Sequence, residues 1–342
     1  MSLNSFISTS RKIMRGDAGV DGDAQRIAQL TWLLFLKVYD AKEADWEFHN
    51  PAYQSIIPKH LRWRSWAPDR KDGRSKTGEE LLTFLNTELF PVLKSLPITA
   101  STPLSQSVVR AVFEDSNQYM KDGILIRQLV NLIDEIDFED YTDRHAFGEI
   151  YETLLKELQS AGSSGEYYTP RAVTDFMIEM INPRLGETVA DFAAGTAGFL
   201  TSTLKHLDEQ VESVEDREAY RSSVYGIEKK PMPYLLGVTN LLLHDVDQPQ
   251  FIHGNSLERN VRDFKDSEKF DVVTMNPPYG GSEKASIQNN FPTACAALRT
   301  ADLFLALILY RLKKKRPCCG HHPRRIPFSA RMPRRSRSNA DC

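Results

Sequence analysis

Cysteine is scarce in this sequence, and its positions argue against two common uses of the residue. There are four cysteines in 342 residues, and Cys318, Cys319 and Cys342 lie near the C-terminal end. A chain with so few cysteines is not a small disulfide-stabilised scaffold. Zinc sites usually space their ligands about two to four residues apart, and the adjacent pair Cys318-Cys319 does not fit that spacing. We therefore predict neither disulfides nor a metal site.

Long apolar runs are absent as well. No stretch approaches the roughly 20 apolar residues that a membrane span needs, and residues 1–6 lack the features of a signal peptide. Hydrophobic residues make up 41% of the sequence and charged residues 26%, which is typical of a globular protein. We predict a cytoplasmic protein without a membrane segment, and the length indicates two domains.

Basic residues are in short supply over most of the chain. Residues 1–310 hold 32 Lys and Arg against 45 Asp and Glu, a net charge of −13. Residues 311–342 hold eleven Lys and Arg against one Asp, a net charge of +10, so the whole chain carries −3. A DNA-binding surface usually needs a basic footprint. If this protein acts on DNA, either a local basic groove or a partner must supply many of the contacts to DNA.

Residues 1–160 have the apolar spacing of helices. Residues 24–43 carry two adjacent apolar stripes, which is typical of a helix buried within a bundle. Thr77–Glu80 has the pattern of a capping box at the start of another helix. Two further helices are predicted at residues 124–136 and 147–158. A helical N-terminal domain follows from these patterns.

One segment of this helical region is predicted to be irregular. Residues 50–76 are rich in Pro, Trp and Arg. Trp63, Arg64 and Trp66 could contact nucleic acid, or they could pack the segment onto the helices. The second interpretation is favoured, because aromatic side chains contribute most to folding when they are buried.

The pattern changes near residue 162. Residues 160–165 are rich in Gly and Ser, which indicates a flexible link. Thr169 is then predicted to cap a helix that has Pro170 at its first position. The buried face of this helix is predicted to hold Val173, Phe176, Met177 and Met180.

Short apolar runs then alternate with helical patterns. Strands are predicted at residues 188–191, 223–228, 250–253 and 270–275, and helices at residues 197–207, 231–244 and 302–312. Such alternation is typical of an α/β fold with a doubly wound, Rossmann-like parallel sheet, which we assign to a second domain, residues 161–314. Ligands in this architecture bind beyond the carboxyl ends of the strands, so residues at those ends are the candidates for function.

The fourth predicted strand runs into Met275-Asn276-Pro277-Pro278-Tyr279. Each proline fixes its own φ and restricts the residue before it, so this corner is rigid. The Asn276 side-chain oxygen and the Pro277 carbonyl can both accept from an NH2 group. The Tyr279 ring can stack on a base that carries that group. The corner therefore suits a planar, amino-bearing substrate, and the alternative is a rigid loop leaving a strand.

A glycine-containing turn follows the first predicted strand. After Asp191, the turn includes Ala194, Gly195, Thr196 and Gly198, and a helix begins. Glycines let the backbone approach a ligand closely, and the helix start presents free N–H groups. The turn has two glycines instead of the three of a dinucleotide fingerprint, so a tight turn with no ligand stays an alternative.

Three more positions are candidates for ligand contact. Glu228 ends the second strand, where an acid can bind two ribose hydroxyls. Asn255 follows the third strand and either bonds an adenine edge or is a turn residue, and the sequence does not separate the two. Tyr168-Thr169 precedes a helix start that could receive a carboxylate.

The order of these motifs carries a resemblance. A Tyr-Tyr-Thr-Pro helix start, a glycine turn, an acidic second strand, an Asn after the third strand and an Asn-Pro-Pro-Tyr corner occur in series. The series resembles S-adenosyl-L-methionine-dependent DNA adenine-N6 methyltransferases, and more closely the modification (methylase) subunits of type I restriction–modification systems. Residues 32–37 and 147–152 are also similar to that family. The resemblance covers about residues 5–312.

The resemblance implies a role for each motif. Asp191, Gly195 and Tyr168-Thr169 are expected around the methionine part of the cofactor, and Glu228 at its ribose. Asn276 through Tyr279 are expected to hold the target adenine of double-stranded DNA. The family also implies two copies of the chain joined to a specificity subunit, with a restriction subunit added for cleavage. Relatives often have Pro and Gly at the positions of Phe192 and Ala197.

The last residues depart from the family pattern. Residues 315–342 are rich in Pro and Arg and lack the apolar periodicity of a strand. We expect a disordered tail, a sheet without its later strands and a fourth strand that forms an exposed edge. An out-of-frame or truncated gene product is favoured over a basic, DNA-binding tail, because this composition builds no core.

Two other functions stay open. A protein glutamine amide is also planar and bears an NH2 group, so the same corner could serve a protein-glutamine methyltransferase. The chain could also be an inactive remnant that binds the cofactor or partner subunits only.

Overall fold

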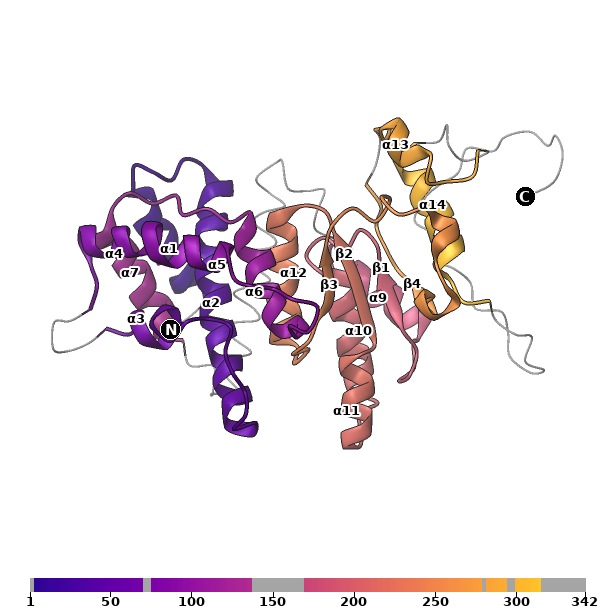
Figure 1. Cartoon of the computed structure of the whole chain (residues 1–342), viewed down its shortest axis with the longest axis horizontal. Coiled ribbons are helices and arrows are strands. Elements are labelled where there is room, and N and C mark those ends of the chain that lie inside the picture. The colour runs from indigo at the N-terminus through magenta and orange to yellow at the C-terminus, as the bar shows by residue number, and fades with distance from the viewer. Residues whose placement is uncertain (1–2, 70–74, 137–168, 279–280, 294–298, 315–342) are drawn as a thin grey trace.

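The chain forms a helical N-terminal unit beside a parallel-sheet unit (Figure 1). The computed structural model describes residues 3–69, 75–136, 169–278, 281–293 and 299–314. Within these ranges no helix combines the length and apolar character that crossing a membrane requires. The predicted helix 147–158, the boundary at residue 160 and the tail 315–342 lie outside the described residues.

The helical unit is built from short helices packed around one long helix, α2. Its α-helices are α1 (Leu3–Arg15), α2 (Asp23–His49), α3 (Trp63–Trp66), α4 (Gly78–Phe84), α5 (Phe90–Lys94), α6 (Leu104–Glu114) and α7 (Gly123–Asp134). A 3-10 turn, Lys59–Leu61, precedes α3, and a π-helical turn, Leu85–Leu89, joins α4 to α5.

Helix α2 is buried around much of its circumference, as its two apolar stripes predict. Trp32 and Phe35 are fully buried, and the Trp32 ring meets Phe90 and Phe113 edge-on at centroid distances of 5.0 and 6.4 Å. The helix is longer than the predicted range of residues 24–43.

The capping prediction for α4 was wrong in detail. Thr77 precedes this helix, but its side chain makes no capping hydrogen bond.

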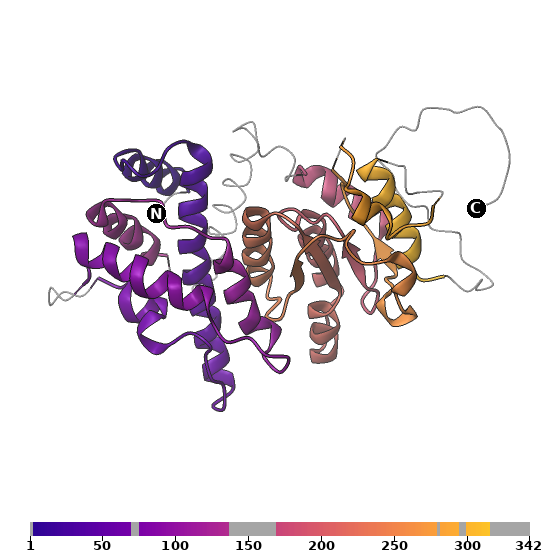
Figure 2. The same ribbon diagram turned by 45° about the horizontal axis from the view of Figure 1, so that its top comes forward.

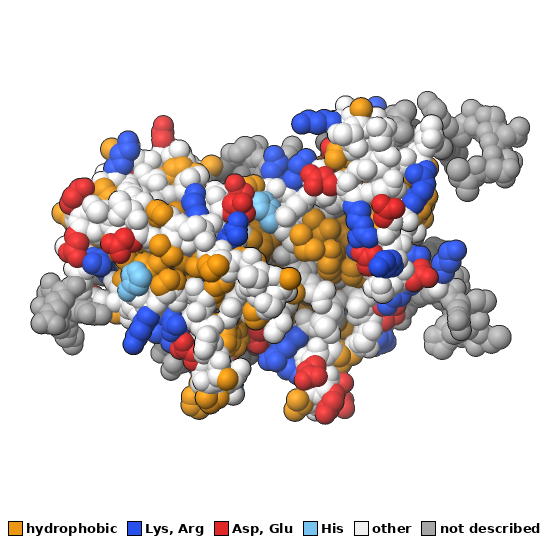
Figure 3. Space-filling model, viewed as in Figure 1, with side chains coloured by type: hydrophobic (Ala, Val, Ile, Leu, Met, Phe, Trp, Pro, Cys, Tyr) orange, Lys and Arg blue, Asp and Glu red, His pale blue; other side chains and the backbone are white. Residues whose placement is uncertain are grey.

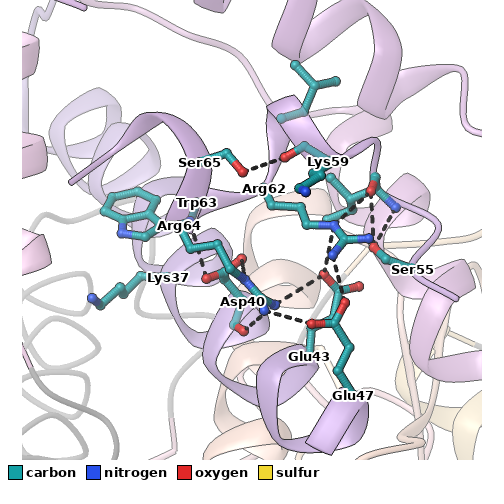
Figure 4. Close-up of polar contacts among 12 residues, drawn as sticks. Lys37, Asp40, Glu43, Glu47, Ser55, Lys59, Arg62, Trp63, Arg64 and Ser65 are labelled. Carbon is teal, nitrogen blue, oxygen red and sulfur yellow. Dashed lines mark hydrogen bonds and ion pairs between the residues drawn. The ribbon is translucent and has the colours of Figure 1, made fainter. Parts of the chain in front are cut away.

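The Trp-rich segment packs onto α2, which confirms the favoured interpretation. Trp63 and Trp66 are buried, whereas Arg64 reaches back to α2 and donates to Asp40 Oδ1 at 3.0 Å (Figure 4). Glu47 of α2 bridges Arg62 and Arg64 at 2.7 and 2.8 Å. These side chains form a charge network that holds the irregular segment on the bundle.

The second unit contains a four-stranded, fully parallel sheet in the order β3-β2-β1-β4. The strands are β1 (Val189–Asp191), β2 (Val224–Glu228), β3 (Gln250–His253) and β4 (Val272–Val273). The helices are α9 (Arg171–Ile181), α10 (Gly198–Asp208), α11 (Val214–Arg221), α12 (Pro231–Leu243), α13 (Ala285–Gln288) and α14 (Thr300–Arg311). Two 3-10 turns, Val261–Asp263 and Asp266–Glu268, lie between β3 and β4. The predicted α/β class is confirmed, although β4 is shorter than the predicted range 270–275.

Strand β4 lies at the edge of the sheet among the described residues, as predicted. The chain after α14 returns beside it, where Leu312 forms a single parallel bridge to Phe270. The Phe270 amide donates to Arg311 O at 2.8 Å, and the Lys313 amide donates to Phe270 O at 2.9 Å. Among the residues that the structure describes, the edge is therefore covered at its start only.

The predictions for α9 were wrong in two respects. The residue before the helix is Pro170, and the first helical residue is Arg171. With Thr169 as the cap, Pro170 would have been the first helical residue, so the helix begins one residue later than predicted. Its buried residues are Thr174, Ile178 and Ile181. The predicted core residues Val173, Phe176 and Met180 are instead 45%, 60% and 68% exposed, and Met177 is half-buried.

Helix α12 joins the two units. It lies between α2 and the sheet in both views (Figure 2), and one continuous apolar core runs from α1 through α12 to Phe251 of β3. Lys42 of α2 adds ion pairs to Asp245 and Asp247, just after α12. The helical unit is thus packed against one side of the sheet unit.

Candidate active site

The turn after β1 contains two residues with a left-handed backbone conformation. Asp191 ends the strand and Gly198 begins α10. Between them Gly195 has φ 55° and Ala197 has φ 64°, both in the left-handed region, which disfavours residues with a Cβ. Ala197 therefore occupies a backbone conformation that favours glycine. A Cβ at Gly198 would lie 2.7 Å from Arg171 Nη1, the end of a flexible side chain that would have to shift.

Four hydrogen bonds hold this turn in place from neighbouring elements. The Gly195 amide donates to Glu228 Oε2 at 2.8 Å, and the Ala194 amide donates to Ile227 O at 3.1 Å. Asn240 of α12 donates from Nδ2 to Thr196 O at 3.1 Å. Ser256 donates to Phe192 O at 2.5 Å. The turn is therefore preorganised before any ligand arrives.

Sequence reasoning missed Asn240 and Ser256. Asn240 lies in the apolar run Leu235–Leu243 and is 2% exposed. A buried amide needs hydrogen-bond partners, so an isolated Asn within a buried helix was the available signal. Ser256 had no such signal, because its neighbour Asn255 made the segment look like an ordinary turn.

Two carboxyl groups at this edge of the sheet are buried. Burial raises the pKa of Asp191 to about 8; the Ala193 amide opposes the shift and the charge of Glu228 adds to it. Burial also raises the pKa of Glu228, against backbone N–H groups of Lys230, Gly195 and Lys229 that lower it. A buried carboxylate is costly unless it is paired. The site therefore favours a ligand that brings a cation or hydroxyl donors.

A small cavity brings together residues from three parts of the sequence. Its lining residues are Thr169, Asp191, Ala193, Ala194, Thr196, Gly198, Phe199 and Asn276. Asn276 follows β4, and its Nδ2 lies 3.4 Å from Thr169 Oγ1. The rigid corner thus faces the glycine turn across this cavity, with Asn276 and Pro277 half-buried and Pro278 exposed.

The other predicted site residues have different positions. Glu228 lies behind the turn through its bond to Gly195. Asn255 is in a turn, where its Oδ1 accepts from the Leu257 amide at 3.1 Å. Tyr168 and Tyr279 lie outside the described residues.

Comparisons with known proteins identify the family of this chain. Residues 142–317 match the N-6 DNA Methylase family, and residues 3–133 match the HsdM N-terminal domain. The chain is 46% identical over 317 residues to the type I restriction enzyme EcoEI methylase subunit of Escherichia coli, covering 92% of this chain and 64% of that protein. It therefore spans somewhat less than two thirds of that relative.

Solved structures give the same result. A chain from Vibrio vulnificus YJ016, described as a modification subunit of a type I restriction enzyme, superposes with a TM-score of 0.78 at 39% identity over 93% of this chain and 68% of that one. A chain from a study of complex assembly and conformational transition in the type I R-M system gives a TM-score of 0.80 at 35% identity over 92% of this chain and 62% of that one. This chain belongs to the N-6 DNA methylase family and, within it, to the methylase subunits of type I restriction enzymes.

Proposed function

We propose that this chain binds S-adenosyl-L-methionine at the cavity beside β1 and transfers its methyl group to N6 of adenine in double-stranded DNA. The observation that carries the proposal is the position of Asn276 on the wall of the same cavity as Asp191 and the glycine turn. A group that accepts from an amine therefore lies next to the backbone that would hold the donor. Family membership supports the same reaction.

The residues present fit such a cofactor. The cofactor supplies an electrophilic methyl group on a sulfonium when it is bound. Asp191, Ala194, Gly195, Thr196, Gly198 and Thr169 would surround its methionine part, and Glu228 would accept from its ribose hydroxyls. The buried carboxyls match this ligand, because its ammonium is a cation and its hydroxyls are donors. Tyr168 and Asn255 stay weaker candidates for contact.

The corner after β4 would activate the adenine. The lone pair of the N6 amine is delocalised into the ring, which makes it a poor nucleophile. If Asn276 Oδ1 and the Pro277 carbonyl each accept one N–H, electron density shifts toward nitrogen and the amine can become pyramidal. Placement and electrostatics then supply the rate without a strong base. Tyr279 would stack on the base after it leaves the helix, which offsets part of the cost of extrusion.

We propose further that the chain works within a type I complex. Two copies would join a specificity subunit, and a restriction subunit would be added for cleavage. Acidic and basic side chains are interspersed on the face seen in Figure 3, and residues 1–310 carry −13. Both observations support DNA recognition that is shared with a partner. The protein would lie in the cytoplasm, the same compartment as its DNA substrate.

Transfer of a labelled methyl group tests the proposal. The purified chain, with and without a specificity subunit, is incubated with labelled cofactor and unmethylated DNA, and label in N6-methyladenine is counted. Asn276→Ala is expected to reduce transfer about a hundredfold or more, by analogy with the loss of one preorganised polar group in other active sites, and to leave cofactor binding nearly unchanged. Asn289→Ala, an exposed residue after α13, is the matched control.

Each alternative gives a different result. Label in a protein glutamine and none in DNA would indicate the glutamine methyltransferase. Cofactor binding without transfer to either substrate, even with the specificity subunit, would indicate an inactive remnant. Unchanged transfer by Asn276→Ala would refute the role of the corner.

A further inference from the structure

A contact between the two units lies next to the cofactor edge of the sheet. Asp115 follows α6 in the helical unit, and His253 ends β3 in the sheet unit. Asp115 Oδ2 is 3.8 Å from His253 Nδ1, and the side chains are 48% and 20% exposed. Surface ion pairs of this kind usually contribute little by themselves. The contact between Asp115 and His253 differs from an ordinary surface ion pair, because other residues also hold the His253 ring.

The His253 ring is fixed on two further sides. Its Nε2 lies 3.2 Å from Lys229 O, and a carbonyl can only accept, so Nε2 carries a proton. Its ring stacks on Tyr234 of α12 at 4.8 Å and 21°, and Tyr234 stacks in turn on Phe251 at 5.4 Å and 9°. With Nε2 donating to Lys229 O, the other ring nitrogen, Nδ1, faces Asp115.

Lys229 is the residue that follows Glu228, so this contact bears on the ribose position. His253 is the register partner of Glu228 across β2 and β3, and the Gly254 amide donates to Glu228 O at 2.9 Å. On the other side, the Lys230 amide donates to Glu228 Oε1 at 2.6 Å. The backbone from Glu228 to Lys230 therefore fixes the position of the Glu228 carboxylate. His253 lies within hydrogen-bond distance of the Lys229 carbonyl in the middle of that segment.

We propose that His253 and Asp115 are positioning residues through which the helical unit sets the geometry of the Glu228–Lys230 segment, and hence the affinity for a ribose-bearing cofactor. The ligand in this inference rests on the proposed function. The positioning itself does not, because it rests on the contacts of the His253 ring with Asp115 of the helical unit and with Lys229 O. In the sheet unit the charge of Glu228 interacts with this imidazole, and Asp115 is the acidic group that faces it from the helical unit.

The test uses the full chain and the variants Asp115→Asn, His253→Gln and the double variant. Glu114→Gln is the control, because it removes an equal charge one residue away from an exposed position. Calorimetric titration with S-adenosyl-L-methionine is expected to show binding about two- to fivefold weaker for Asp115→Asn. The double variant should be no weaker than His253→Gln alone, since both act through one contact. The KM for the cofactor should rise by a similar factor, with kcat changing less.

Hydrogen exchange in the absence of ligand gives a second, independent readout. The amides of Lys230, which donates to Glu228 Oε1, and of Tyr234, which donates to Lys230 O, should exchange faster in Asp115→Asn than in the wild-type protein or Glu114→Gln. Unchanged exchange would overturn the inference, whatever the cofactor does. If exchange rises but the wild-type protein binds no cofactor, the proposed function fails and the positioning stands. If the wild-type protein binds and Asp115→Asn binds equally well, the inference alone fails.

Discussion

Asp191 is the residue whose chemistry the fold alters most clearly at this site. It is 1% exposed, and burial raises its pKa to about 8, from about 3.9 in an unfolded chain. The folded protein therefore keeps a proton that the unfolded chain loses. Because the pKa of Asp191 is higher in the folded protein, protonated Asp191 contributes fully to the free energy of unfolding below about pH 4. This contribution is lost as the pH rises to about 8.

Asp191→Asn tests this directly, because an amide cannot ionise. Its unfolding temperature relative to that of the wild-type protein is expected to rise steadily between about pH 5 and pH 8. Thermal unfolding by circular dichroism, without ligand, measures the difference at each pH. Asp263→Asn, an exposed carboxyl near β4, should show no such trend. A flat difference for Asp191→Asn would mean that the carboxylate is ionised and stabilised by groups not considered above.

Single residues could be placed at the edge of the sheet from sequence where their chemical type was unusual for a strand end. Asp191, Glu228 and Asn276 stood out in that way. Asn255 was ambiguous because Asn serves turns as readily as ligands. Asn240 and Ser256 were missed, because their importance lies in which backbone carbonyl they reach, and that depends on packing between distant elements.

At the scale of elements, periodicity identified helices well but not the direction each one faces. The apolar residues of α9 repeat at helical spacing, yet Thr174 and Ile178 face the core and Phe176 faces outward. Spacing defines an apolar stripe, and it does not say which neighbour covers it. The predicted ends of strands were inaccurate for a similar reason. Strand β4 forms only at Val272–Val273, because strand pairing depends on which residues lie beside each position.

The contact between β2, β3 and α12 depends on glycine, which the sequence did not reveal. The Phe251 ring packs against Gly226 of β2 and Gly237 of α12, where an added Cβ would lie 2.4 and 2.7 Å from ring carbons. Gly226→Ala should therefore destabilise the protein by about 1–3 kcal/mol through overpacking. Urea unfolding followed by circular dichroism measures this. Gly254→Ala is the control, because the nearest atom to its Cβ would be 3.9 Å away, and an equal loss there would point to backbone effects instead.

At the scale of the whole molecule, the two units are expected to unfold together. Their apolar core is continuous from α2 through α12 to β3, and Lys42 and Asp115 add polar contacts across the boundary. Sequence reasoning placed a boundary between domains at residue 160 from composition alone. Composition cannot show how much apolar surface two neighbouring units share, and that shared surface decides whether they are independent.

The tryptophans make this coupling measurable. All four, Trp32, Trp46, Trp63 and Trp66, belong to the helical unit, so their fluorescence reports on that unit alone. Gly226→Ala alters only the packing of the sheet unit, yet it should lower the urea midpoint seen by tryptophan fluorescence as much as the midpoint seen by circular dichroism, because a two-state transition looks the same to every probe. A fluorescence midpoint that stays at the wild-type value would show that the helical unit folds without the sheet. The shared core would then be a docked interface, and the route from Asp115 to Glu228 would connect two separable domains.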